Sequence, residues 1–366
     1  MRCAVLATRN LEFLGNRVFD PIAIQAMRPQ LRSMALPWLH VHRVAREHGI
    51  RLLTADRAEQ EGIDARRVLL VAYDWTPDAA RLVARGARPA VLVSFEPPVI
   101  AWWLYAHLPR VSARFRHVFL FGGARDRVAA SARFHQLYFP VLLPSARLPR
   151  VAWQHRRFLV LVNSNKALPR VRDPARWLDR PREVSLKRAL AALRYRPIAA
   201  DRYTDRWRAI EAFARLADFD LYGEGFERRH PAISPRLHAR ALRAYRGVTQ
   251  DKRELLSRYR FALVFENTRF PGYVSEKLFD CLFAGAIPVY DGAPDVSRYV
   301  PHHVFIDRQR FGTYTELERF LRELPEREAE RYREAGQAFL RSPEFQPFSV
   351  DTFARELVDM LRDSDG

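Results

Sequence analysis

The 366-residue sequence has only two cysteines, Cys3 and Cys281, which are too few for a disulfide framework. Both stand in apolar contexts, which fits a protein of the reducing cytosol. No apolar run reaches the ~20 residues that a membrane-spanning helix needs. The first eight residues are typical of a strand, and they are too short and lack the cleavage site of a signal peptide. We therefore expect a globular cytoplasmic protein.

Several catalytic signatures are also missing. The sequence contains no Walker-type phosphate loop, no G-x-S-x-G elbow and no H-E-x-x-H zinc motif. Asp218 and Asp220 spell D-x-D, but they straddle the entry to a predicted strand. The histidines, including the pair His302 and His303, have no carboxylates at metal-ligand spacing. We expect no cofactor and no essential divalent metal.

Lysine is rare, since it stands only at positions 166, 187, 252 and 277 and arginine supplies the other positive charges. This bias is consistent with a GC-rich genome. The formal net charge is nevertheless +19, which favours anionic partners such as nucleotide sugars, acidic lipids or nucleic acid. A solvated arginine-rich surface is the alternative interpretation.

Short apolar runs alternate with helical patterns along the chain, which predicts parallel, doubly wound sheets. The first set of runs predicts strands at residues 1–8, 50–55, 67–73, 89–95, 117–121 and 137–143, with helices at 21–49 and 76–86. The second set predicts strands at 158–162, 219–222, 261–265, 287–290 and 304–306, with helices at 203–216, 251–258, 276–284, 314–324 and 326–340. An amphipathic helix at 350–361 is the last predicted element.

The length of the chain is sufficient for two domains. We expect an α/β domain at residues 1–145 and a second at 158–345, joined by a linker rich in proline and arginine. We expect the C-terminal segment 346–366 to pack back on the first domain as a helix. The basic segment 166–202 shows no clear strand, and its role stays open.

A candidate anion site follows the predicted strand 261–265. A polar loop leads from it to Ser275, a good N-cap residue, and Gly285 ends the helix that follows. Lys277 stands in the first helical turn, where the helix dipole disfavours a cation. The N-terminus of a helix binds anions, so this lysine suggests a bound anion that offsets the repulsion.

The segment 265–277 reads Phe-Glu-Asn-Thr-Arg-Phe-Pro-Gly-Tyr-Val-Ser-Glu-Lys. It resembles the donor-binding motif F-E-N…Y-[VIL]-[ST]-E-K of the family 10 α-1,3/1,4-fucosyltransferases, and its spacing fits the bacterial members. The resemblance covers most of residues 89–340 and is strongest at 261–301. It implies a GT-B-like fold of two Rossmann-like domains that face each other across a cleft. The implied reaction is an inverting transfer of L-fucose from GDP-fucose to a hydroxyl of a glycan acceptor.

Such a reaction requires cations that stabilise the leaving pyrophosphate. Lys277 and one arginine of the predicted helix 203–216 are the candidates. The family has an arginine at the start of this helix, followed by apolar residues four and seven positions later. Arg206 satisfies that pattern with Ile210 and Phe213, whereas counting back from Tyr222 favours Arg208. We expect Arg206 to act in catalysis and keep Arg208 as the alternative.

Other donor-binding residues follow from the same frame. Glu276 can accept two hydrogen bonds from a ribose diol, and the resemblance implies that Asn267 and Tyr273 contact the sugar or the phosphates. Two further strand ends resemble family segments. These supply Tyr222 and Gly223 after one strand, and Ser164 and Asn165 after another.

The general base is expected in the first domain. Glu96 follows the predicted strand 89–95 and therefore lies at the carboxyl end of a parallel strand, where α/β proteins place their sites. The segment Phe-Glu-Pro-Pro resembles the family's F-E-[SN]-P, whose glutamate is the proposed base. A carboxylate in a fixed, partly buried loop suits that task.

The expected partners are a GDP-sugar and a glycan or glycolipid acceptor, such as lipopolysaccharide or capsule. The positive charge favours peripheral contact with anionic lipid at the inner face of the membrane. One alternative keeps the fold but uses another GDP-hexose. The other is a basic nucleic-acid-binding protein, but the arginines are scattered and not interleaved with aromatic residues, so we expect no nucleic-acid partner.

Overall fold

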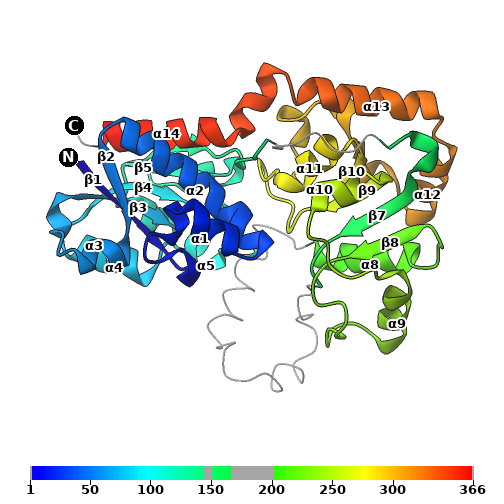
Figure 1. The fold of residues 1–366 in the computed structure, drawn as a ribbon, viewed down its shortest axis with the longest axis horizontal. Coiled ribbons are helices and arrows are strands. Elements are labelled where there is room, and N and C mark those ends of the chain that lie inside the picture. Colours follow the sequence, from blue (N-terminus) through cyan, green and yellow to red (C-terminus); the bar gives the residue numbers. More distant parts are fainter. Residues whose placement is uncertain (1, 144–150, 166–201, 365–366) are drawn as a thin grey trace. The chain divides into compact units, whose positions relative to one another are not determined.

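The computed structural model describes residues 2–143, 151–165 and 202–364. It divides the chain into two compact units (Figure 1). Unit 1 comprises Met1–Leu143 and Gln346–Gly366, and unit 2 comprises Pro144–Phe345. Most of the basic segment 166–202 lies outside the described residues.

Unit 1 contains a six-stranded sheet in which every strand pair is parallel, with the order β2-β1-β3-β4-β5-β6. Its strands are β1 (Arg2–Thr8), β2 (Ile50–Thr54), β3 (Val68–Tyr73), β4 (Arg88–Val93), β5 (His117–Leu120) and β6 (Arg133–Gln136). Its helices are α1 (Pro21–Ala26), α2 (Pro29–Glu47), α3 (Ala55–Gln60), α4 (Pro77–Ala84), α5 (Trp102–Ala106), α6 (Leu108–Ser112) and α14 (Val350–Asp363). All six residues of β3 are buried, as expected for a parallel strand covered on both faces.

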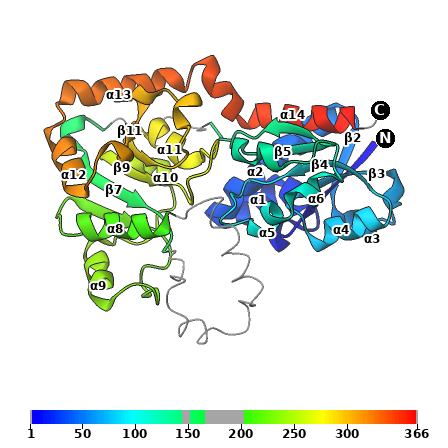
Figure 2. The ribbon, with the colours of Figure 1, turned by 180° about the vertical axis from the view of Figure 1, so that it is seen from behind.

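The C-terminal helix α14 belongs to unit 1, where it packs against α2 and β4 (Figure 2). Its apolar face explains this position. The ring of Phe353 meets Trp38 of α2 edge-on at 5.9 Å and stacks on Phe119 of β5 at 5.6 Å. Ser349 caps the helix and forms an isolated parallel bridge with Val141. The last segment of the chain therefore completes the core of the first unit.

Unit 2 contains a five-stranded parallel sheet with the order β11-β10-β9-β7-β8. Its strands are β7 (Arg157–Val162), β8 (Phe219–Tyr222), β9 (Tyr259–Phe265), β10 (Ile287–Asp291) and β11 (Ile306–Asp307). Its helices are α8 (Tyr203–Phe213), α9 (Pro235–Ala244), α10 (Lys252–Leu256), α11 (Glu276–Ala284), α12 (Tyr314–Glu323) and α13 (Glu326–Phe339). Numbered within its own unit, this order is the 2-1-3-4-5 of a doubly wound sheet, and the first five strands of unit 1 repeat it.

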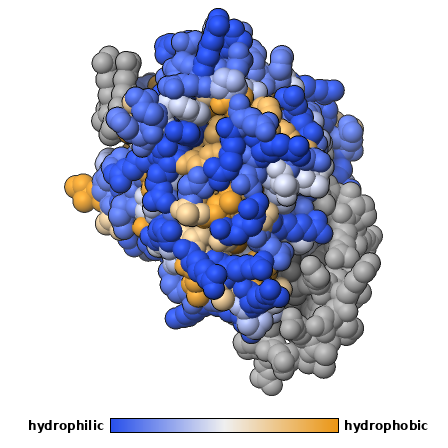
Figure 3. Space-filling model, turned by 90° about the vertical axis from the view of Figure 1, so that its right-hand side faces the viewer, coloured by the Kyte–Doolittle hydropathy of each residue, from blue (hydrophilic) through white to orange (hydrophobic). Residues whose placement is uncertain are grey.

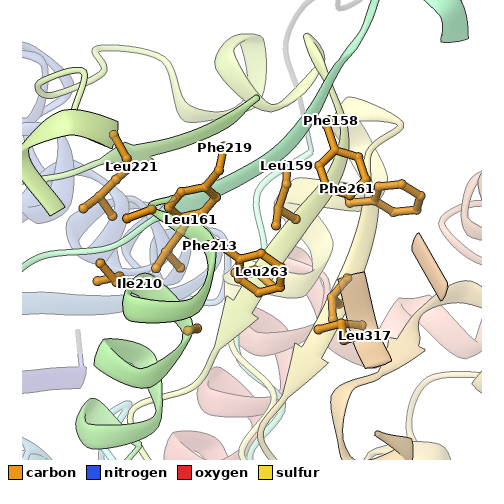
Figure 4. Packing of buried hydrophobic residues seen from close by; sticks show 14 of the residues in the cluster. Phe158, Leu159, Leu161, Ile210, Phe213, Phe219, Leu221, Phe261, Leu263 and Leu317 are labelled. Carbon is orange, nitrogen blue, oxygen red and sulfur yellow. The ribbon is translucent and has the colours of Figure 1, made fainter. Parts of the chain in front are cut away.

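A hydrophobic core of unit 2 forms between this sheet and the helices packed on it, α8 and α12 among them (Figure 4). The strands contribute Phe158, Leu159, Leu161, Phe219, Leu221, Phe261 and Leu263, while α8 contributes Ile210 and Phe213 and α12 contributes Leu317. The alternation of strands and helices predicted this doubly wound class, and the two parallel sheets confirm it. The packing fixes α8, which carries both candidate arginines, beside the sheet.

Two local expectations are wrong. The sixth strand of unit 1 occupies Arg133–Gln136 and not 137–143, because the edge of the sheet pairs with a partly exposed, polar segment. The apolar stretch after it buries Leu137 and Val141 and pairs through the isolated bridge of Val141 with Ser349, not as a strand. The backbone of its Pro140 cannot donate to a ladder. The predicted helix 21–49 is two helices, since Pro29 begins a new one. Helix α9 escaped notice although Ser234 and Pro235 form a regular start signal.

Arginine supplies most of the positive charge of the chain, and the face of the molecule in Figure 3 is largely hydrophilic. Ion pairs neutralise many of these arginines: Arg322 of α12 binds Asp218 and Glu318, and Arg331 of α13 binds Glu328. A nucleic-acid-binding surface typically has a continuous stripe of positive charge, and alternating opposite charges do not form one. Among the described helices, none combines the length and the apolarity needed to cross a membrane.

Candidate active site

The carboxyl ends of the unit 2 strands bring the predicted donor residues to one edge of the sheet. In this sheet β7 has β8 on one side and β9 on the other, so the chain changes direction beside β7. Ligands of doubly wound sheets bind outside the carboxyl ends at such a switch point. The strand ends supply Ser164 and Asn165 after β7, Tyr222 and Gly223 at β8, Asn267 after β9 and Asp291 at the end of β10.

Glu266 organises the loop between β9 and α11. Its carboxylate is fully buried and accepts hydrogen bonds from the backbone nitrogen of Ser275 at 2.7 Å and from the Ser275 hydroxyl at 2.7 Å. The ammonium of Lys277 donates to the same carboxylate at 3.3 Å. Glu266 therefore ties the end of β9 to the first turn of α11 and fixes the lysine. No role was predicted for this residue from the sequence, although it is the glutamate of the Phe-Glu-Asn motif.

Two cations, Lys277 and Arg206, lie on the elements at this edge of the sheet. Burial lowers the pKa of Lys277, but the carboxylates of Glu276 and Glu266 outweigh burial and raise that pKa above its ordinary value. Arg206 of α8 is 1% exposed, and its positive charge acts to lower the pKa of Lys277. The Arg206 guanidinium also lies 5.1 Å from the ring centre of Tyr203. Like charges in the interior favour an anion beside them.

Arg208 lies elsewhere. Its side chain is 65% exposed, and it pairs with Asp205 on its own helix at 3.1 Å. A two-residue step turns a helical side chain to the opposite side. The structure therefore buries Arg206 and leaves Arg208 exposed.

A third cation, Lys252, lies behind Lys277. Both lysines line a small cavity of about 10 Å³ together with Asn163 and Cys281, which is room for about one water molecule. The Lys252 ammonium pairs with Asp280 at 3.0 Å. Burial opposes its charge, yet the carboxylates of Asp280 and Glu276 raise the pKa of Lys252 above its usual value. In the sequence, Lys252 is notable only as one of four lysines, and no role was predicted for it.

The remaining residues of the motif loop form a frame. Asn267 is half-buried, and its Nδ2 donates to the hydroxyl of the buried Tyr273 at 3.3 Å. The Tyr290 hydroxyl donates to the backbone oxygen of Tyr273 at 3.5 Å. Glu276 begins α11, and 34% of its side chain remains exposed, with Oε1 3.7 Å from the Lys277 ammonium. This carboxylate is accessible to a ligand hydroxyl.

The β7 and β8 ends approach each other closely. Gly223 has a φ of +136°, and a Cβ there would lie 1.8 Å from the backbone oxygen of Asn163, so only glycine fits. The Asn165 amide Nδ2 donates to the backbone oxygens of Gly225 and Arg228 at 2.8 and 2.9 Å. Asn165 thus closes the loop after β8. Ser164 and Tyr222 are half-buried beside it.

A further charged group, centred on Asp291, escaped the sequence reasoning. The Asp291 carboxylate is buried and forms ion pairs with Arg202 and, at 3.4 Å, with Arg269. The backbone nitrogen of Arg202 donates to the oxygen of Asn267 at 3.2 Å. These contacts fix the start of α8, and hence Arg206, to the ends of β9 and β10. No local pattern could reveal contacts between residues this far apart in sequence.

In unit 1, Glu96 follows β4 at the carboxyl edge of the sheet. Its backbone nitrogen donates to the Ser94 hydroxyl at 3.2 Å, and the Tyr105 hydroxyl donates to its backbone oxygen at 3.2 Å. Pro97 and Pro98 follow and are buried, while the glutamate itself is half-buried. The predicted base therefore stands on a backbone held from two sides. A hollow of about 910 Å³ in this unit lies beside α3 and α4, where Arg81 and Arg85 line it.

The acidic residues of the D-x-D pattern do not form a metal site. Asp220 is fully buried, and its carboxylate forms ion pairs with Arg157 at 2.8 Å and Arg246 at 2.9 Å. It also accepts a hydrogen bond from the Tyr259 hydroxyl at 2.6 Å. Across residues 2–143, 151–165 and 202–364, no cluster of three His, Cys, Asp or Glu side chains is placed to hold a metal ion.

Comparison with solved structures defines the class of fold. The chain is similar to the crystal structure of an alpha1,3-fucosyltransferase, with a TM-score of 0.53 and 14% sequence identity over 99% of this chain and 90% of that one. At this identity the likeness shows the fold alone, which is that of the GT-B glycosyltransferases.

Sequence comparison then identifies the family. Residues 195–335 match the model of "Glycosyltransferase family 10 (fucosyltransferase) C-term". The chain is 44% identical over 69 residues to an alpha-(1,4)-fucosyltransferase of Arabidopsis thaliana, which covers 19% of this chain and 17% of that one. It is 31% identical over 116 residues to the GDP-fucose protein O-fucosyltransferase 3 of Bos taurus, covering 32% and 23%. The matches thus span less than a quarter of these relatives. Part of unit 2 thus matches the family 10 glycosyltransferase domain, which confirms the resemblance read from the motif.

Proposed function

We propose that this protein is an inverting glycosyltransferase that moves L-fucose from GDP-fucose to a hydroxyl of a glycan acceptor. The observation that carries the proposal is the buried pair of cations, Arg206 and Lys277, at the carboxyl edge of unit 2. The family match and the names of the relatives, which are fucosyltransferases, support fucose as the sugar.

Arg206 and Lys277 stabilise the leaving group. When the bond between fucose and GDP breaks, negative charge develops on the diphosphate, and preorganised cations in a dry site are most effective there. The N-terminus of α11 adds backbone N–H groups that face an anion. Lys277 is already held by Glu266, so it does not have to reorganise during the reaction.

The other donor residues orient the nucleotide. Glu276 accepts hydrogen bonds from the ribose hydroxyls with its exposed carboxylate oxygens, since a carboxylate matches a vicinal diol. Asn267 and the hydroxyl of Tyr273 contact the sugar or the phosphates. Tyr222, Gly223 and Ser164 allow close approach of the backbone, and Asn165 supports the same loop from behind.

Glu96 of unit 1 acts as the general base. It takes the proton of the acceptor hydroxyl while that oxygen attacks the anomeric carbon of fucose from the face opposite GDP, which inverts the configuration. The fixed backbone of Glu96 suits the positioning that proton transfer requires. Two cations beside the leaving group make a divalent metal unnecessary.

The acceptor is proposed to be lipopolysaccharide, capsule or another bacterial glycan, reached from the cytoplasm. The net charge of +19 favours peripheral binding to the anionic inner leaflet.

The proposal is tested by incubation of the protein with GDP-fucose, GDP-mannose and GDP-rhamnose without acceptor, followed by measurement of the GDP released. Slow hydrolysis of GDP-fucose, unchanged by EDTA, is expected. Faster hydrolysis of GDP-mannose or GDP-rhamnose would show that the donor sugar is not fucose. Loss of hydrolysis in EDTA would contradict the metal-free mechanism.

A further inference from the structure

Helix α9 lies at the edge of unit 2, next to α8 and to the edge strand β8 (Figure 1). The Ser234 hydroxyl caps its first turn by accepting the backbone N–H of Leu237 at 3.2 Å. The helix buries Ala241 and Ala244, which belong to the hydrophobic core of the unit. Packing therefore fixes one face of α9, and its other faces point away from that core.

One of these other faces is positively charged. Arg236, Arg240 and Arg243 follow each other at spacings of four and three residues, which places them on one side of the helix. Arg236 and Arg243 are exposed, and Arg240 is half-buried. Within the described part of the chain, none of the three forms an ion pair with a carboxylate. The segment 228–246 contains six arginines and neither aspartate nor glutamate, so α9 has no acidic residue of its own to neutralise this charge.

Two other helices of unit 2 differ from α9 in this respect. Helices α12 and α13 alternate arginines with glutamates, and Arg322 and Arg331 form ion pairs within them. Like charges four residues apart destabilise a helix, as Arg236 and Arg240 do in α9. An anionic partner would offset that cost and would also provide the charge that the chain does not.

The same part of the chain exposes large apolar side chains. Among the described residues of unit 2, the large apolar side chains that are exposed are Leu242, at 42%, and Val248, at 49%. Leu242 lies on α9 beside Arg243, and Val248 follows the end of the helix. Apolar groups next to unpaired arginines are typical of a segment that lies in a membrane interface. A nucleic acid would bind the arginines through its phosphates and would not require the two apolar residues.

We propose that α9 and the segment 228–248 form a docking surface for a membrane that contains anionic lipids. The inference rests on the proposed function for the peripheral membrane contact, and it adds the surface that makes this contact. Arg236, Arg240 and Arg243 pair with the anionic headgroups, and Leu242 enters the interface beside them. A second copy of this chain is a poor partner for this surface, because it presents the same positive charge.

The first test measures co-sedimentation of the full chain with vesicles of phosphatidylcholine and phosphatidylglycerol, with vesicles of phosphatidylcholine alone as the reference. One variant combines Arg236→Gln, Arg240→Gln and Arg243→Gln, since glutamine keeps a high helix propensity. Each arginine near an anionic membrane contributes about fivefold to the affinity, so this variant should bind the anionic vesicles about 100-fold more weakly. The wild-type protein should bind vesicles of phosphatidylcholine alone only weakly.

The matched control combines Arg319→Gln, Arg327→Gln and Arg341→Gln. These arginines are exposed in other parts of unit 2, and the change in net charge is the same. Charges farther than a Debye length from the membrane are screened, so the control should lose less than about fivefold in affinity. An equal loss in both variants would show that binding depends on the overall charge, and it would overturn the inference. Thermal unfolding of both variants verifies that they are folded.

The second test distinguishes a membrane from a nucleic acid. Leu242→Gln removes an apolar group from α9 and leaves every arginine in place. It should weaken binding to the anionic vesicles about fivefold, because part of this side chain no longer enters the apolar layer. Its binding to a single-stranded RNA oligonucleotide should equal that of the wild type. Unchanged vesicle binding in Leu242→Gln would contradict the membrane assignment, as would tighter binding of the wild type to the RNA than to the vesicles.

These measurements use neither donor nor acceptor. GDP-fucose binding, measured by calorimetry, should be the same in the wild type and in all three variants, because the proposed donor residues are not among the substituted positions. A protein that binds anionic vesicles but no GDP-fucose would contradict the proposed function and leave the docking surface intact. A protein that binds GDP-fucose but no anionic vesicles would overturn the docking surface and leave the proposed transfer reaction intact.

Discussion

The two units share a strand order, yet they use the same topological position differently. In unit 1 the switch point lies between β1 and β3, and the chain's own ion pair of Arg9 with Asp74 spans it. In unit 2 it lies between β7 and β9, where Lys277 and Arg206 present buried positive charge. The unit 1 edge thus holds an exposed arginine paired with a buried carboxylate, whereas the unit 2 edge gathers two cations, with Lys277 held by Glu266, at the N-terminus of a helix.

This difference explains where the sequence carries a recognisable motif. A nucleotide diphosphate is a constant ligand, and its charge requires the same residue types in one short frame, as residues 265–277 show. The family match at residues 195–335 lies in unit 2. The proposed glycan acceptor presents only hydroxyls, which many side chains can bind, so on this proposal unit 1 needs fewer fixed residues.

The largest effect is expected at the unit 1 edge. Glu96→Gln keeps the size of the side chain but cannot accept a proton near neutral pH, so transfer should fall about 10²–10⁴-fold. GDP-fucose binding, measured by calorimetry, should stay at the wild-type level, because Glu96 belongs to the acceptor half. A variant that fails to bind the donor would place Glu96 on the donor side and remove the division of labour between the units.

The next effect concerns the cations of unit 2. Arg206→Ala and Lys277→Ala should each reduce turnover roughly 30- to 1000-fold, which corresponds to a loss of about 2–4 kcal/mol of transition-state stabilisation. Each substitution removes a protein cation that is proposed to stabilise the negative charge of the leaving group. Arg208→Ala is the matched control, since it removes the same charge from an exposed position on the same helix. Normal turnover in Arg206→Ala together with loss in Arg208→Ala would show that the wrong arginine was assigned.

A smaller effect should separate stability from catalysis. Glu266→Ala leaves the Lys277 ammonium and the Ser275 hydroxyl without their buried partner, so the free energy of unfolding should fall by about 3 kcal/mol. Urea unfolding measures this change. The matched variant Glu254→Ala loses an exposed ion pair with Arg258 and should change stability by less than about 1 kcal/mol. Equal losses in both would mean that Glu266 does not organise the loop.

The smallest expected effect is specific to unit 1 and depends on pH. His117 contacts His135 at 2.9 Å and Asp363 at 3.1 Å, and burial lowers the pKa of His117 to about 4. The unfolded histidine takes up its proton at higher pH, so stability should fall as pH decreases from about 6.5 to 4. His117→Gln should weaken this dependence of stability on pH. Hydrogen exchange at a series of acidic pH values measures the change. An unchanged pH profile would show that the pair does not titrate as described.

The sequence predicted the elements that rely on local patterns. Helix α11, with Ser275 before it and Gly285 after it, has the expected bounds because cap residues and apolar spacing act within a few positions. The choice between Arg206 and Arg208 could not be made in this way, since both fit a helix and only the packing of α8 decides which is buried. The ion pairs of Asp291 join segments that are distant in sequence. The left-handed backbone of Asp74, with a φ of 63°, cannot be recognised from the residue type. Those features depend on tertiary structure.

The most direct test of the account measures nucleotide-sugar binding to wild type, Arg206→Ala and Arg208→Ala by calorimetry and thermal shift. A ligand that binds only the folded protein raises its melting temperature. We expect GDP and GDP-fucose to bind and stabilise wild type and Arg208→Ala, and Arg206→Ala to bind both far more weakly. UDP-glucose and CMP-sialate should have no effect. Stabilisation by UDP-glucose or CMP-sialate without any by GDP or GDP-fucose would contradict it.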